Sequence, residues 1–119
     1  MTLHISVYIR DKETGVRTSV KLPPGKDLGG FESYRHKFWG HEIMTELGLK
    51  LLPSLGKGAW LNIEGDELEV LERDATIIEQ NSILIGEKTE LAEEDVLRYA
   101  GNISFAVHLG KEIGGGVSI

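Results

Sequence analysis

The sequence contains no cysteine and only three prolines in 119 residues. Without cysteine the chain has no disulfide, no thiolate metal site and no cysteine nucleophile. A chain of this length can bury roughly two thirds of its unfolded surface. It therefore has no need of such cross-links, and we expect residues 1–119 to form a single domain.

Long apolar runs are also missing. The longest uninterrupted ones are a few residues, against the ~20 that a membrane-spanning helix requires. The first ten residues, MTLHISVYIR, lack both the basic start and the apolar stretch of a targeting segment. These patterns predict a soluble, cytoplasmic protein with no membrane partner.

Recognised chemical motifs are absent as well. An HE pair occurs at His41 and Glu42, but position 45 is Thr, so the HExxH spacing of zinc proteases fails. Lys57 follows Gly56, but position 51 is Leu, so the phosphate-binding GxxxxGK loop fails too. There is no GxGxxG and no GxSxG. The sequence assigns no catalytic residue, metal ligand or cofactor, and it favours a protein without enzymatic activity.

Acidic residues are abundant and unevenly placed. The net charge is −6, and residues 64–95 hold twelve Asp and Glu against Arg73 and Lys88. This balance argues against nucleic-acid binding, which needs clustered Lys and Arg. It allows a basic protein partner, although most charge runs are solvated helix faces.

Strand patterns dominate the N-terminal part. Leu3, Ile5, Val7 and Ile9 alternate with polar residues, which is typical of a half-buried strand. A polar break at 11–15 and a second alternating run over 16–22 predict a β-hairpin. Residues 59–64 favour a third strand, with Leu61 and Ile63 on one face. Trp60 lies on the other face, where we expect a second core layer to cover it; the alternative is exposure at an interface.

Helical patterns follow. Residues 26–58 predict a glycine-rich loop, two short helices or one broken helix, and a second loop at 54–58. Leu68, Leu71, Ala75 and Ile78 predict an amphipathic helix that starts at Glu67 after Asp66 as N-cap. Residues 83–85 are interpreted as an apolar link. A last helix, capped by Thr89, should bury Val96, Ala100, Ile103 and Val107, with Gly101 packed closely against a neighbour.

Gly114, Gly115 and Gly116 are expected to end that last helix before a short strand at 117–119. The predicted fold class is therefore α+β. A small, mainly antiparallel sheet contains the N-terminal hairpin, the central strand and the short C-terminal strand, and two amphipathic helices pack on one face.

Two groups of residues are candidate binding sites. The first lies between Glu32 and Glu46, where Trp, Tyr and Arg are typical of interaction hot spots; it comprises Tyr34, Arg35, His36, Trp39, His41 and Glu42. Glu32 and His36 are four residues apart, so on a helix they could form a general base or part of a metal site. The second group is acidic: Glu67, Glu69, Glu72 and Asp74.

Three functions are consistent with these patterns. The first is a non-enzymatic protein-interaction module, of the inhibitor or immunity type, that presents an acidic helical surface to a basic protein. The second is a small-molecule or metal-binding enzyme centred on Glu32–Glu46. The third is a structural homo-oligomer subunit, which in its simplest form is a homodimer.

Overall fold

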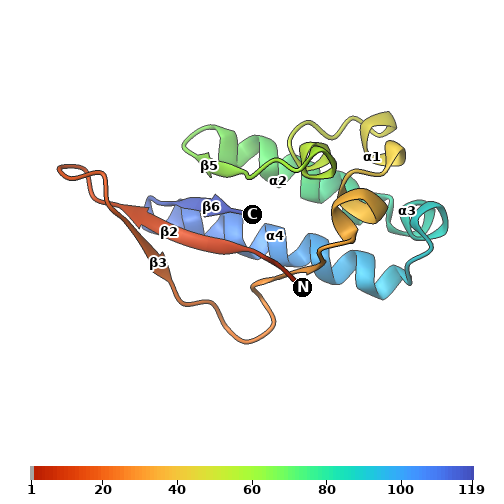
Figure 1. Cartoon of the computed structure of the whole chain (residues 1–119), viewed down its shortest axis with the longest axis horizontal. Coiled ribbons are helices and arrows are strands. Elements are labelled where there is room, and N and C mark those ends of the chain that lie inside the picture. The colour runs from red at the N-terminus through yellow and green to blue at the C-terminus, as the bar shows by residue number, and fades with distance from the viewer. Residues whose placement is uncertain (1) are drawn as a thin grey trace.

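The computed structural model describes residues 2–119 and confirms the α+β class (Figure 1). Its strands are β1 (Thr2–His4), β2 (Ser6–Arg10), β3 (Arg17–Val20), β4 (Leu28–Phe31), β5 (Asn62–Glu64) and β6 (Gly116–Ser118). Its helices are the π-helical turn η1 (Arg35–Trp39), α1 (Glu42–Glu46), the 3-10 helix η2 (Leu52–Lys57), α2 (Glu67–Gln80), α3 (Ser82–Thr89) and α4 (Glu93–Ile113).

The main sheet is antiparallel and has the strand order β3-β2-β6-β5. The last strand in the chain therefore lies inside the sheet, and β1 pairs with β4 in a separate two-stranded sheet. The long helices α2 and α4 pack against each other, and α4 runs along the sheet in contact with β2 and β6 (Figure 1). The predicted helical stripes are buried as expected, from Leu68 to Ile78 and from Val96 to Val107.

The predicted N-terminal hairpin is confirmed, with Val7 opposite Val20 and Ile9 opposite Thr18. Its first strand is divided, however, because the N–H group of Ile5 donates to the Asp27 carbonyl at 2.7 Å. The hairpin also projects beyond the helices (Figure 1). Ile9, expected in the core, is 43% exposed, because β6 pairs with β2 only over residues 6–8 and Ile9 lies beyond that pairing.

Residues 26–58 contain the two short helices that the sequence predicts, η1 and α1. The two expected loops were wrong in part. Residues 28–31 form β4, whose partner β1 comes from the start of the chain, and residues 52–57 form η2. The local sequence shows neither the strand that pairs with β4 nor the tertiary contacts of η2. The glycines and Pro53 therefore suggested loops.

The expected apolar link at 83–85 was also wrong, because these residues belong to α3. Thr89 does not cap α4. Its hydroxyl donates to the Ile85 carbonyl at 2.7 Å and ends α3 instead, whereas Ala92 occupies the N-cap position of α4. Asp66 does occupy the N-cap position of α2, but its side chain makes no capping hydrogen bond. No helix of residues 2–119 has the length and apolarity to cross a bilayer.

Two of the three glycines that follow α4, Gly114 and Gly116, have different structural roles. Gly114 ends the helix in the left-handed region at φ 67°, as predicted. A Cβ on Gly116 would lie 2.6 Å from the Tyr8 ring, so the missing side chain lets Tyr8 lie across β6. A Cβ on Gly101, in contrast, would have no atom from a neighbouring element of residues 2–119 within 4 Å, and the expected close packing there was wrong.

Candidate functional site

Trp60 is the most exposed large apolar side chain of residues 2–119, at 77%. It directly precedes Leu61, whose backbone N–H and C=O both bond to Ile119. Its backbone is therefore held at the edge of the main sheet while its indole stands in solvent. The preferred expectation of a second core layer over Trp60 was wrong, and the alternative of an exposed position is what the structure has.

Arg35 fixes this segment from η1. Its residue is only 8% exposed, its Nη1 donates to the Ala59 carbonyl at 3.0 Å, and its Nε donates to Glu32 Oε1 at 2.5 Å. The guanidinium carbon lies 5.3 Å from the centroid of the Trp60 ring, within cation–π range. The indole is thus supported on one side by a buried, hydrogen-bonded cation and is open on the other.

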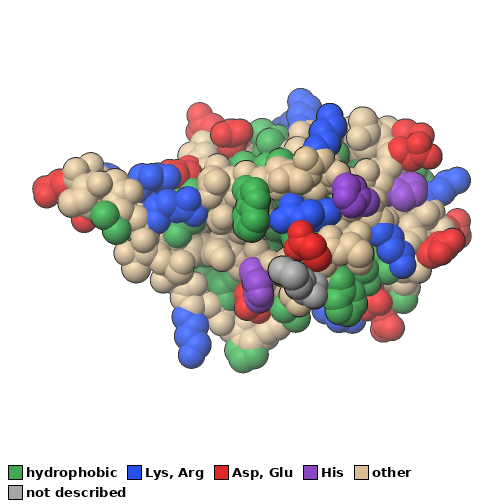
Figure 2. All heavy atoms as spheres, viewed as in Figure 1, with side chains coloured by type: hydrophobic (Ala, Val, Ile, Leu, Met, Phe, Trp, Pro, Cys, Tyr) green, Lys and Arg blue, Asp and Glu red, His purple; other side chains and the backbone are tan. Residues whose placement is uncertain are grey.

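A cavity of about 170 Å³ adjoins Trp60. Its lining comes from four parts of the chain: Thr2, Leu3, His4, Ser6, Glu32, Arg35, Trp60, Ser118 and Ile119. Phe31, which is 60% exposed, lies opposite Thr2 in the β1–β4 pair. On the face shown in Figure 2, hydrophobic side chains lie among Lys, Arg, His, Asp and Glu side chains.

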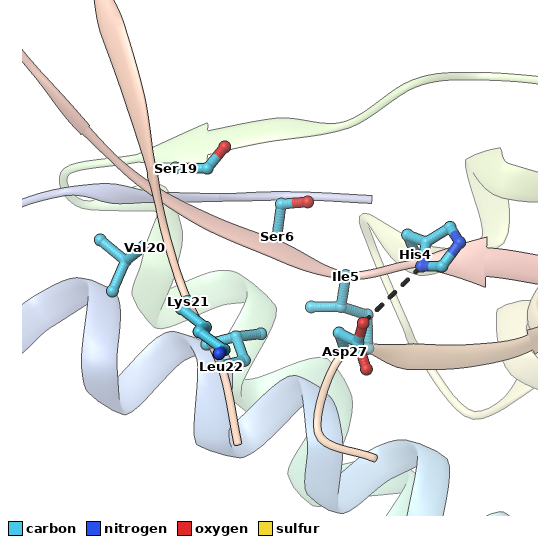
Figure 3. Close-up of a pocket in the computed structure, with 8 residues that line it drawn as sticks. All are labelled: His4, Ile5, Ser6, Ser19, Val20, Lys21, Leu22 and Asp27. Atoms are coloured by element: carbon cyan, nitrogen blue, oxygen red, sulfur yellow. Dashed lines mark ion pairs between the residues drawn. The ribbon is translucent and has the colours of Figure 1, made fainter. Parts of the chain in front are cut away.

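A second cavity, of about 350 Å³, adjoins the first, and His4 and Ser6 line both. Figure 3 shows it between Ile5 and Ser6 on one side and the segment Ser19–Leu22 on the other. His4 Nδ1 lies 3.9 Å from Asp27 Oδ2 at its rim. Lys21 also lines this cavity, so its charged groups are of both signs and all of them are accessible to water.

The predicted site at Glu32–Glu46 is divided between the core and the surface. Trp39 is fully buried and its indole N–H donates to the Gly29 carbonyl at 2.9 Å. Tyr34 is half-buried and makes edge-on contacts with Phe31 and Tyr99, and burial raises its pKa. Trp39 therefore has no exposed surface with which to contact a partner.

The polar residues of the same segment are not assembled into one centre. Glu32 bonds to Arg35, and His36 and Glu42 are exposed. The half-buried His41 caps α1 through Nδ1, which accepts the Ile43 N–H at 3.1 Å. Within residues 2–119 no three His, Asp or Glu side chains form a group that could hold a metal ion.

The acidic group on α2 is divided as well. Asp74 is 1% exposed, and its carboxylate accepts the N–H groups of Lys50, Leu51 and Leu52 at 2.9, 2.8 and 3.0 Å. It fixes the approach to η2 and is not part of any surface. The prediction that Asp74 belongs to an acidic surface was therefore wrong.

The other three acids remain accessible to different degrees. Glu69 and Glu72 both accept from Lys111 of α4, at 2.9 and 3.3 Å, and Lys111 lowers the pKa of Glu69. Glu72 Oε2 also lies 3.3 Å from His108 Nε2. Glu67 is exposed. The acidic surface of α2 is therefore smaller than the sequence suggests, and Lys111 and His108 of α4 lie beside it.

Sequence reasoning missed the partnership of Arg35 with Trp60, because the two residues lie in separate elements and no motif connects them. The available signals were separate: Trp60 is one of only two tryptophans, and Arg35 is of a hot-spot residue type. Only the fold places them together.

Comparison with protein-family models, curated proteins and solved structures found no match for this chain.

Proposed function

We propose that this protein is a protein-interaction module and that the surface around Trp60 is its binding site. The observation that carries the proposal is the exposure of Trp60 on a fixed support. Tryptophan contributes large binding energies at interfaces because it buries much apolar area. Arg35 and the pairing of Leu61 with Ile119 hold the segment in place, so binding would order few additional groups.

The proposal is tested by Trp60→Ala in an affinity-capture experiment from the source cells, followed by measurement of the dissociation constant for the captured protein. Because the side chain is exposed, the variant should fold with nearly unchanged stability. Its affinity for the partner should fall at least tenfold, as expected for a central hot spot, about 1.4 kcal/mol or more.

Ile83→Ala is the matched control, since Ile83 is 64% exposed on α3 and lines a different cavity. This variant should retain full affinity. Equal affinity of Trp60→Ala and the unchanged protein would overturn the proposal, and an equal loss in both variants would indicate that any exposed apolar group is sufficient.

A second candidate is an inhibitor or immunity-type protein that uses its acidic helical surface against a basic partner. The exposed side chains of Glu67 and Glu69 in the first turn of α2 favour it. Acidic surfaces of this kind increase the association rate with basic proteins. Asp74 and its three backbone bonds are outside this surface.

A further inference from the structure

Strand β3 lies at one edge of the main sheet, and within residues 2–119 its neighbouring strand in that sheet is β2. At the hairpin end, Asp11 donates to the Val16 carbonyl at 2.8 Å, which makes these two residues a hydrogen-bonded pair. Antiparallel bonding alternates along a strand, so Thr18 bonds to β2, whereas the N–H and C=O groups of Arg17 and Ser19 point outward. The outer edge of β3 therefore presents the backbone groups to which another strand can bond.

Apolar side chains beside this edge are exposed. Val16 is 60% exposed, and Ile9, which lies opposite Thr18, is 43% exposed. The side chains of Val16, Thr18 and Val20 lie on the same face of the strand, because successive residues point to opposite faces. Residues 16–19 are all exposed and the hairpin reaches beyond the helices (Figure 1), so the edge is accessible to a strand of another molecule.

The charges along β3 select among the ways in which this edge can pair with the same edge of a second copy. Outward backbone groups must bond to outward groups, so a two-fold axis can pass Arg17, Thr18 or Ser19. With the axis at Arg17, the two copies of Arg17 lie opposite each other. With the axis at Ser19, Arg17 lies opposite Lys21 of the second copy. Like charges directly opposite destabilise a strand pair, which disfavours both registers.

The register with the axis at Thr18 has no such conflict. Each Arg17 then lies opposite Ser19 of the second copy, and each Val16 lies opposite Val20. The two Thr18 side chains meet at the axis, and pairs of threonines across two strands are favourable. In this register no cation directly opposes another, and the most exposed valine of the hairpin gains an apolar neighbour.

The charge of Arg17 is also directed away from the edge. Its guanidinium carbon lies 3.9 Å from the centroid of the Tyr8 ring, and Tyr8 belongs to β2 on the inner side of β3. The guanidinium group is thus held over β2, and the outer backbone of β3 is left open to a second strand.

We propose that two copies of this chain pair through β3, antiparallel and with the two-fold axis at Thr18, so that their main sheets join into one. The paired segment is short, so the dimer should form in a concentration-dependent manner. Strand β5, which Trp60 precedes, lies at the opposite edge of the main sheet. A β3 dimer therefore leaves both Trp60 surfaces open, and the inference does not depend on the proposed function.

Single cysteines report on the register, because the chain has no cysteine of its own. Thr18→Cys places two thiols across a non-hydrogen-bonded pair with Cα atoms about 4.5 Å apart, within the range of a disulfide. Ser19→Cys is the matched control, since in the proposed register its two Cα atoms are roughly 7–8 Å apart, too far for a disulfide. Under mild oxidation at equal concentration, Thr18→Cys should form linked dimers at least roughly tenfold faster.

A second pair of variants tests the edge without cross-linking. In sedimentation velocity, the unchanged chain should show a dimer fraction that rises with concentration. Ser19→Pro removes an outward N–H group that β2 does not use, so the variant should fold and remain monomeric. Ser19→Ala keeps the N–H group and should associate like the unchanged chain.

Equal cross-linking rates for the two cysteine variants, or a faster rate for Ser19→Cys, would overturn the inference. An unchanged chain that sediments as a monomer at every concentration would overturn it as well. If Ser19→Pro then failed to capture a protein that Ser19→Ala captures, β3 would accept a strand of that protein in place of a second copy.

Discussion

At the scale of single residues, the roles of Asp74 and Trp60 are the reverse of what their residue types suggest. The aspartate is buried, whereas the tryptophan is exposed. Buried carboxylates are tolerated when hydrogen bonds satisfy them, and Asp74 has three. Composition alone assigns both residues to the wrong environment because it contains no information on hydrogen-bond partners that are distant in sequence.

The stability contribution of Asp74 can be measured with Asp74→Asn. The amide keeps one carbonyl acceptor but places an NH₂ group against backbone donors of residues 50–52, so at least one buried N–H loses its partner. We expect the free energy of unfolding, measured in urea, to be about 2 kcal/mol lower than that of the unchanged protein.

Glu67→Gln is the control on the same helix. It neutralises an exposed carboxylate, and it should change the unfolding free energy by no more than about 0.5 kcal/mol. Similar small losses in both variants would contradict the structural role assigned to Asp74.

At the scale of elements, one group of side chains connects all four strands of the main sheet. Arg17 of β3 lies 3.9 Å from the ring centroid of Tyr8 on β2, the Tyr8 ring lies across Gly116 of β6, and its hydroxyl donates to Glu64 of β5 at 2.9 Å. Arg10 of β2 donates to the same carboxylate through Nε and Nη2, at 3.1 and 2.6 Å. This cluster joins β2 to β5 across the strand between them.

The cluster gives the fold a defined acid sensitivity. Hydrogen bonds from Arg10 and Tyr8 lower the pKa of Glu64 from its ordinary value of 4.5. A carboxyl with a lowered pKa in the folded state stabilises the protein above the unfolded pKa, and this contribution is lost as the pH falls through the folded pKa. Stability should therefore decrease below about pH 4.5.

Glu64→Gln tests this dependence through urea midpoints from neutral to acidic pH. The variant should be less stable than the unchanged protein at neutral pH, and the two curves should converge in acid. Glu42→Gln, an exposed carboxyl with no hydrogen bond or ion pair within residues 2–119, should follow the unchanged protein throughout. Parallel curves for Glu64→Gln and the unchanged protein would show that Glu64 is not coupled to folding.

The sequence predicted best those helices and strands whose residue pattern lies within one continuous stretch of the chain. The stripes of α2 and α4 repeat within each helix, and the β2–β3 hairpin joins neighbouring runs, so both are visible in the chain itself. Strand β4 has two glycines in four residues and is a strand only because β1 pairs with it. The Arg35–Trp60 contact and the cavity beside it depend on such distant pairings, which explains why the sequence analysis could name the residues but not the site.

At the scale of the whole molecule, charge is the property that a partner encounters first. The net charge of −6 is unevenly distributed along the chain. Most acidic residues follow residue 63, and most basic residues precede it. Interactions between exposed charges are screened over about 8 Å at physiological salt, so location determines their influence as much as number does.

If the acidic surface of α2 binds a basic partner, the position of the acidic residues should affect the association rate more than their number does. Reversing Glu67 and Glu69 together to Lys changes the net charge from −6 to −2, because each reversal adds two. The association rate with a basic partner should fall roughly tenfold at low ionic strength and much less at high ionic strength. Stopped-flow measurements at both ionic strengths provide the comparison.

Reversing the exposed Glu87 and Glu94 to Lys produces the same net charge on other elements, α3 and the start of α4. Association should then remain close to that of the unchanged protein. If both double variants slow association equally, total charge is responsible and the α2 surface has no special role.

The position of β6 in the sheet has a consequence for how the protein is made. Strands β2 and β5 each lie beside β6, yet β6 follows both of them, and all the helices, along the chain. A nascent chain can form the β2–β3 hairpin early, but the sheet stays in two pieces until residues 116–118 have left the ribosome. Hydrophobic strand edges therefore stay uncovered while the residues between β2 and β6 are synthesised, and a late step must join the hairpin to β5 through β6.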